Sequence, residues 1–175
     1  FAYYGSGGIT LMRNALETGA FDTFLGADGM LSDEVIAQIG AENMGNVTFT
    51  TSASDSTTPA FAAWAALAEG AGIPASDPFV PNSYDAAFML ALAIEKTGDD
   101  NRASVSAALR SISSAPGEVI LPGEWAKAKA ILAAGGDINY EGAAGNQDFD
   151  ENGDVAGLFS QSSVVDGAWS ATLIK

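Results

Sequence analysis

The chain has 175 residues, of which 22 are acidic and 7 are basic, so its formal net charge is −15 at pH 7. It contains no His and no Cys, which excludes Ser-His-Asp and Cys-His catalysis within the chain, thiolate zinc sites and thiol redox chemistry. The excess of acidic residues opposes binding to nucleic acid or to anionic membranes, and no apolar run reaches the length of a transmembrane helix.

Strand-like and helix-like patterns alternate in the first third of the chain. They predict strands over 2–4, 23–25 and 46–51, and helices over 9–18 and 33–39. Gly19 would end the first helix, and Ser32 would cap the second. Strands that alternate with helices are typical of a parallel α/β sheet. Because the chain begins inside an apparent strand, we expect it to be a fragment of a longer protein.

A stretch of Ser, Thr, Ala and Asp over 50–58 indicates a connector between two domains. The pattern after it predicts helices over 59–70, 84–97, 103–113 and 124–133, and a short strand over 118–121. Asn82 or Ser83 would cap the second of these helices. That helix is apolar on nearly every face, so we expect it to be buried against a sheet.

The tail of the chain allows two interpretations. Residues 148–153 match the first half of a calcium-binding EF-hand loop, but Phe159 stands where that loop needs its final glutamate. The favoured alternative is a hairpin turn at Asn152-Gly153, a pair that tolerates positive φ angles. This alternative predicts a return strand over 155–165, a second turn at 166–167 and a last strand over 169–174.

Two features near the N-terminus are candidates for ligand contacts. The segment Gly5-Ser6-Gly7-Gly8 lies between a predicted strand and helix, where it forms either a tight turn or a cradle of N–H groups for an anion. Asp28 follows Ala27 at the C-terminal end of a predicted parallel strand, where open α/β sheets bind ligands. Its carboxylate would either hold a ligand ammonium or satisfy local N–H groups.

Four segments follow one another with a characteristic spacing: Tyr3-Tyr4-Gly5, Phe24-Leu25-Gly26-Ala27-Asp28-Gly29, Ser83-Tyr84-Asp85-Ala86 and Phe149-Asp150-Glu151-Asn152-Gly153-Asp154. This ordered set resembles the type I periplasmic binding proteins. The similarity is greatest to the branched-chain amino acid (leucine/isoleucine/valine) group of ABC-transporter substrate-binding proteins. It covers almost the whole chain and relates it to the C-terminal half of that family.

The resemblance implies an incomplete α/β, doubly wound fold that contains parts of two lobes. Residues 1–52 would belong to the second lobe, 53–160 to the first lobe, and 161–175 to the second lobe again. The implied function is periplasmic binding of an amino acid, branched-chain or a related small amide, and its delivery to an ABC permease. No enzyme activity and no cofactor are implied.

Position by position, the resemblance implies that Asp28 holds the α-ammonium of the ligand and that Phe79 closes over it. Ala27 and the segment Ser6-Gly7-Gly8 would add cleft contacts. This segment lacks an aromatic residue that family members often carry, and Asp28 replaces the longer Glu of some members, so the size of the cleft differs. Partners for the ligand carboxylate would lie in a missing N-terminal half. We therefore expect weak or no binding by the chain alone, and stabilisation by that half or by a second copy.

Three alternatives remain open from the residues. A sensor or receptor domain of the same fold would carry the same segments. A calcium-binding structural module would use the loop over 148–153. A hydrolase that depends on two carboxylates would need acids that converge on one cleft, but the obvious pairs, Asp33-Glu34 and Asp99-Asp100, are neighbours in sequence.

Overall fold

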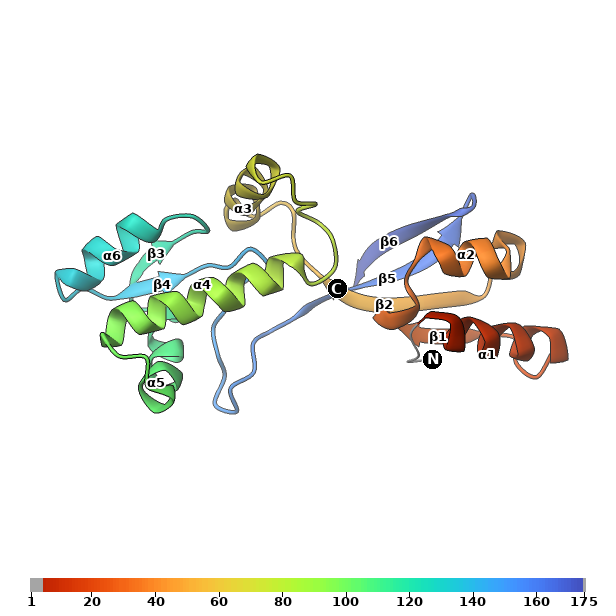
Figure 1. The fold of residues 1–175 in the computed structure, drawn as a ribbon, viewed down its shortest axis with the longest axis horizontal. Coiled ribbons are helices and arrows are strands. Elements are labelled where there is room, and N and C mark those ends of the chain that lie inside the picture. Colours follow the sequence, from red (N-terminus) through yellow and green to blue (C-terminus); the bar gives the residue numbers. More distant parts are fainter. Residues whose placement is uncertain (1–4, 175) are drawn as a thin grey trace. The chain divides into compact units, whose positions relative to one another are not determined.

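The computed structural model describes residues 5–174 (Figure 1). The chain divides into two compact units, which we call unit 1 (Phe1–Ala53 with Phe159–Lys175) and unit 2 (Ser54–Leu158). The strand predicted over 2–4 lies outside the described residues. Among residues 5–174, no helix has the length and apolar character needed to cross a membrane.

The described residues of unit 1 form a four-stranded sheet with two α-helices. Its elements are α1 (Gly5–Thr18), β1 (Phe24–Ala27), η1 (Asp28–Met30), α2 (Asp33–Ile39), η2 (Ala41–Asn43), β2 (Val47–Ala53), β5 (Leu158–Val165) and β6 (Ala168–Ile174). The strand order is β1-β2-β5-β6, with β1 parallel to β2 and β5 antiparallel to β6. The predicted helix over 33–39 and the strands near 23–25 and 46–51 are confirmed.

One face of this sheet carries the core of unit 1. Val47 and Phe49 are buried on β2, whereas Thr48 and Thr50, which alternate with them, are only partly buried, as the two-residue period of a strand requires. Helices α1 and α2 pack on this face, since their apolar side chains join Phe49 in a single cluster. The members of that cluster are Ile9, Met12, Phe24, Met30, Val35, Ile39, Met44, Val47 and Phe49.

Helix α1 begins at Gly5, so the prediction that Gly5-Ser6-Gly7-Gly8 forms a loop is wrong. Glycine is a poor helix former, and local propensity alone therefore favours a loop here. Tertiary packing overrides it, because Ile9 and Met12 on the next turn are fully buried in the core of unit 1.

Two turns in the tail follow the hairpin interpretation. Asp166 and Gly167 have φ angles of 50° and 81°, as a two-residue hairpin turn requires, and they join β5 to β6. Near Asn152-Gly153, Phe149 and Val155 form only an isolated antiparallel bridge, and β5 starts at Leu158 rather than at 155. Asp150 holds this turn, because its Oδ1 accepts the N–H groups of Asn152 and Asp154 at 2.8 and 2.9 Å.

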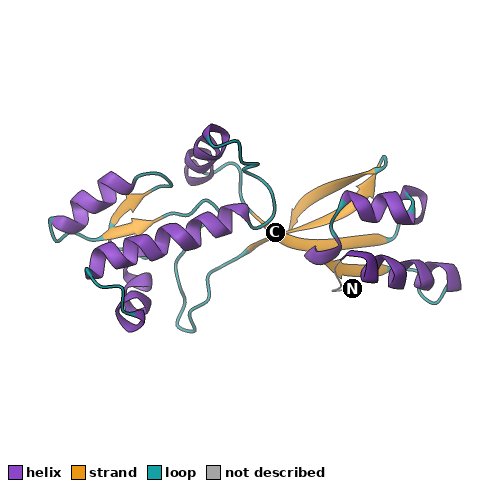
Figure 2. Cartoon of the chain, in the orientation of Figure 1, coloured by secondary structure: helices purple, strands orange, loops and turns teal. Residues whose placement is uncertain are grey.

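Unit 2 is mostly helical (Figure 2). Its elements are α3 (Pro59–Gly70), α4 (Val80–Thr97), α5 (Arg102–Ser113), β3 (Glu118–Ile120), α6 (Trp125–Ala133) and β4 (Ile138–Tyr140). Strands β3 and β4 are parallel and are connected through α6. The largest buried cluster of the unit consists of Met89, Leu92, Ile112, Ile120, Ala128, Ile138 and Tyr140.

The four predicted helices of unit 2 are confirmed, but α4 begins earlier than the sequence pattern indicates. It starts at Val80 rather than at Tyr84, so neither Asn82 nor Ser83 is its cap. The residue before the helix is Phe79, in a left-handed conformation with φ 65°. Pro81 suits the first turn of a helix because it needs no N–H partner there, and this allows the early start.

Candidate functional site

Asp28 lies at the C-terminal end of β1. Ala27, the last residue of that strand, pairs with Thr50 of β2, and Asp28 opens η1 directly after it. The main-chain oxygen of Asp28 accepts the N–H of Leu31 at 2.9 Å, but its half-buried carboxylate has no hydrogen-bond or ion-pair partner among the described residues. A free carboxylate at the carboxyl edge of parallel strands is well placed to bind a cationic group of a ligand.

The glycine segment belongs to the same unit as Asp28. Helix α1 packs against η1, and Ile9 and Met12 share the core cluster of Met30. Gly7 is exposed and Gly8 is buried; the backbone of Ser6 is helical. A Cβ added at Gly7 would meet nothing within 4 Å, so packing does not require a glycine there. The first N–H groups of any α-helix lack partners within the helix, so this segment still carries hydrogen-bond donors.

Phe79 belongs to unit 2, so it does not share a unit with Asp28 and the glycine segment. Its main-chain oxygen accepts both the N–H and the hydroxyl of Ser83, at 2.9 and 2.8 Å, which holds the backbone at the start of α4. The ring is 46% exposed. A left-handed conformation costs a residue with a Cβ about 1–2 kcal/mol. Strained, exposed residues of this kind are concentrated at ligand contacts.

A buried polar centre around Asp85 does not follow from the sequence pattern. Asp85 is 2% exposed, and its Oδ1 accepts the hydroxyl of Tyr140 at 2.6 Å and the N–H of Ala143 at 2.8 Å. Its Oδ2 accepts the N–H of Ala144 at 2.8 Å and a longer bond from Gln147 Nε2 at 3.4 Å. The available signal is a single acidic residue directly before the apolar run over 86–94.

Burial raises the pKa of Asp85, although its hydrogen bonds from Tyr140, Ala144 and Ala143 act in the opposite direction. Burial and the nearby charge of Asp85 also raise the pKa of Tyr140. This hydroxyl therefore stays protonated and donates a hydrogen bond to Asp85. The centre therefore joins α4 to β4 and to the segment after it. It is a structural element rather than a free binding group, because every oxygen of the carboxylate already has donors.

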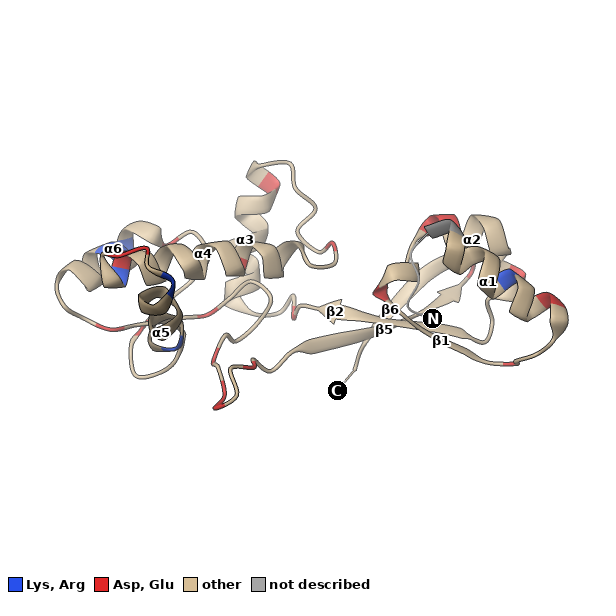
Figure 3. Cartoon of the chain, turned by 60° about the horizontal axis from the view of Figure 1, so that its bottom comes forward, with Lys and Arg blue, Asp and Glu red and all other residues tan. Residues whose placement is uncertain are grey.

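Acidic side chains are spread over both units, and basic ones are few (Figure 3). The ion pairs found among the described residues all lie in unit 2; they are Lys96–Asp137, Lys127–Glu118, Lys127–Glu124 and Lys129–Glu95. Within the same residues, no group of three or more acidic side chains is placed to hold a metal ion.

Residues 6–160 match the family described as the receptor family ligand binding region. The chain belongs to this family. Among curated proteins, a relative of this family member is the chemotactic signal transduction system substrate-binding protein BasB of Halobacterium salinarum. The two are 39% identical over 71 residues, which are 41% of this chain and 17% of BasB.

Two solved structures resemble the fold of this receptor-family chain. One is the branched-chain amino acid transporter substrate-binding protein LivJ of Streptococcus pneumoniae in complex with isoleucine, with a TM-score of 0.60 and 18% identity. The other is the leucine-binding protein LivK of Thermotoga maritima, with a TM-score of 0.62 and 22% identity. Each match covers 99% of this chain, but only 43% of LivJ and 42% of LivK.

These findings confirm the type I periplasmic-binding-protein fold and the α/β class expected from the sequence. The chain spans less than half the length of the two solved proteins. The receptor ligand-binding family is a family of binding proteins and not of enzymes.

Proposed function

We propose that this chain is part of an extracytoplasmic, periplasmic solute-binding protein that binds an amino acid, branched-chain or a related small amide, and delivers it to an ABC importer. The observation that carries this proposal is the half-buried carboxylate of Asp28, which has no partner among the described residues at the carboxyl end of β1. An α-ammonium group would give it a charge-assisted hydrogen bond. The isoleucine named with LivJ is a ligand of this kind.

In this proposal, unit 1 belongs to the second lobe of the family fold and unit 2 to the first lobe. Phe79 contacts the apolar side chain of the ligand with its exposed ring, and Ala27 and the segment over 6–8 contribute main-chain contacts. We infer that partners for the ligand carboxylate belong to a further segment of the protein, because this chain spans less than half the length of the two solved relatives.

A second candidate function is chemotactic sensing, and the similarity to BasB favours it. Binding of the amino acid is the same in both functions. The membrane protein that recognises the ligand-bound form is a permease in the first function and a signal transducer in the second. Copurification of the ligand-bound protein with each of these two membrane proteins would distinguish them.

The first experiment is calorimetric titration of L-isoleucine into the protein completed to the length of its structural relatives. We expect Asp28→Asn to weaken binding by roughly a hundredfold, about 3 kcal/mol, because a desolvated ammonium would lose its charged partner. Asp28→Glu should restore much of the affinity. Asp33→Asn, which changes an exposed acid of α2, is the matched control and should have no effect.

Unchanged affinity in Asp28→Asn would remove Asp28 from the site. We expect the chain of 175 residues by itself to bind weakly or not at all, so a micromolar dissociation constant for it would contradict the division of the site between this chain and a further segment. Native mass spectrometry would then show whether the chain associates with an N-terminal segment or with a second copy.

A further inference from the structure

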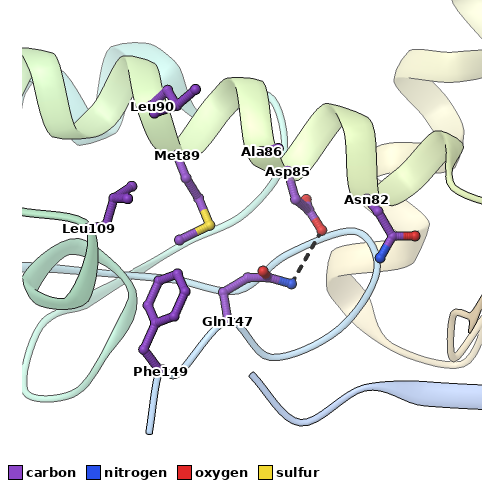
Figure 4. A pocket seen from close by; sticks show the side chains of 8 residues that line it. All are labelled: Asn82, Asp85, Ala86, Met89, Leu90, Leu109, Gln147 and Phe149. Atoms are coloured by element: carbon purple, nitrogen blue, oxygen red, sulfur yellow. Dashed lines mark hydrogen bonds between the residues drawn. The ribbon is translucent and has the colours of Figure 1, made fainter. Parts of the chain in front are cut away.

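A pocket of about 310 Å³ lies between α4, α5 and the segment over 147–149, wholly within unit 2 (Figure 4). It contains none of the residues assigned to the amino-acid site. Ligand pockets in proteins start at about this size. The lining residues are Asn82, Asp85, Ala86, Met89, Leu90, Leu109, Gln147 and Phe149.

Two carboxamides provide free hydrogen-bonding groups in this pocket. Gln147 Nε2 donates to Gly145 O at 3.0 Å and to Asp85 Oδ2 at 3.4 Å, which leaves the Gln147 carbonyl oxygen without a partner among the described residues. The exposed side chain of Asn82 has no hydrogen bond within the same part of the chain. In Figure 4 both amides lie near Asp85, and the nitrogen of Asn82, not its oxygen, is on the side of Asp85. Asn82 therefore offers a donor and Gln147 an acceptor.

The rest of the pocket is apolar. Met89 is 4% exposed, Leu90 on the next position is 47% exposed, and Phe149 is half-buried. Figure 4 shows the thioether of Met89 directed toward the ring of Phe149, with Leu109 on the same side. Thioethers and aromatic rings make favourable contacts with aromatic ligands.

The charge in the wall selects against anions. Asp85 brings a carboxylate to the pocket, and the chain carries a net charge of −15. The carboxylate oxygens of Asp85 already accept hydrogen bonds from Tyr140, Ala143, Ala144 and Gln147, so this carboxylate does not need a cationic ligand. A neutral ligand therefore fits this pocket best.

We propose that this pocket is a second ligand site, which takes a small uncharged amide that carries an aromatic or branched apolar group. The amide exchanges hydrogen bonds with Asn82 and Gln147, and the apolar group lies against Met89, Leu90 and Phe149. The ligand leaves the bonds of Asp85 intact. This site is independent of the amino-acid site that includes Asp28.

The test uses 2-phenylacetamide as the probe and the isosteric anion phenylacetate as its comparison, each titrated into the ¹⁵N-labelled chain. We expect saturable shifts of the side-chain NH₂ signals of Asn82 and Gln147, with a dissociation constant on the order of 1 mM for a ligand of this size. Phenylacetate should bind at least about tenfold more weakly. Absence of saturable shifts with 2-phenylacetamide, or equal binding of the anion, would overturn the proposal.

Matched variants locate the site. Ala86→Phe fills the pocket from α4 and should weaken the binding of 2-phenylacetamide at least about tenfold, whereas Ala87→Phe, at the next exposed position outside the lining, should keep it within about twofold. If Ala86→Phe fails to fold, Leu90→Glu places a charge at the apolar end and should give the same loss. Equal binding by the pocket variant and Ala87→Phe would contradict the assignment. Asp28→Asn should leave these shifts unchanged, which separates this test from that of the amino-acid site.

Discussion

The hydroxyl of Tyr140 donates a buried hydrogen bond of 2.6 Å to the carboxylate of Asp85, 55 positions earlier in the chain. This bond joins α4 to β4 at a point where both residues are almost inaccessible to water. Because a hydrogen bond to a buried charge cannot be replaced by one to solvent, its loss leaves the carboxylate poorly satisfied.

Tyr140→Phe removes only this hydroxyl and keeps the buried ring. We expect the free energy of unfolding to fall by about 2 kcal/mol, the usual cost of leaving a buried charged acceptor without one of its donors. Urea denaturation followed by circular dichroism measures it.

Tyr84→Phe is the matched control. The hydroxyl of Tyr84 accepts the N–H of Gly123 at 2.8 Å in an exposed contact, and water can replace it. We expect a loss below about 1 kcal/mol. Equal losses in the two variants would mean that the bond between Tyr140 and Asp85 contributes no more to the free energy of unfolding than the exposed bond of Tyr84.

The raised pKa of Asp85 gives its contribution to stability a definite pH dependence. Burial makes the folded chain hold this proton more tightly than the unfolded chain, in which the pKa is near 3.8. The stabilisation is therefore fully present below pH 3.8 and is lost as the pH rises through the raised pKa of the folded chain. Tyr140 stays protonated throughout this range.

Comparison with Asp85→Asn isolates this effect, because all other titrating groups are shared. We expect the free energy of unfolding of the native chain, relative to that of Asp85→Asn, to decrease with rising pH and then to level off. Urea denaturation of both proteins over a series of pH values measures the difference. A difference that increases with pH would show that hydrogen bonding outweighs burial at this carboxylate.

Local patterns in the sequence predict most of the helices but not the long-range polar contacts. Thr58 caps α3 through a 3.1 Å bond from the N–H of Phe61, and Pro59 follows it, a combination that marks a helix start in the sequence itself. The bonds of Asp85 join segments more than 50 positions apart, and nothing local specifies them. The parallel pairing of β3 with β4 is likewise set by packing, since each strand has only three residues.

Phe79→Gly should leave the free energy of unfolding unchanged within about 1 kcal/mol, although it removes a large side chain. Relief of the left-handed conformation offsets the greater entropy of glycine in the unfolded chain, and the exposed ring contributes little packing. Ala87→Gly, in the regular part of α4, should cost about 1 kcal/mol because nothing offsets that entropy there. Thermal unfolding of the two variants gives the comparison, and a larger loss at Phe79 would show that its ring stabilises the fold.

Salt should stabilise this chain. Its net charge is −15, and the described residues of unit 1 form no ion pair, so many exposed acids repel one another. Raising NaCl from 0.01 to 1 M shortens the Debye length from about 30 Å to about 3 Å, which screens this repulsion. We expect Tm to rise by several degrees, and an uncharged osmolyte at equal osmolality to produce a smaller rise. No change in Tm would mean that repulsion among the exposed acids does not destabilise the folded chain relative to the unfolded one.

The two-residue length of the turn at Asp166-Gly167 fixes the register of β6 against β5. With this length, Trp169 lies opposite Val164, packs against Phe49 and donates its indole N–H to Ser32 O at 3.0 Å. One added residue would shift β6 by a single position and turn every side chain of the strand to the opposite face of the sheet. Trp169 would then leave the core of unit 1. Insertions and deletions among relatives should therefore avoid this turn, even though it lies on an exposed loop where length changes are otherwise tolerated.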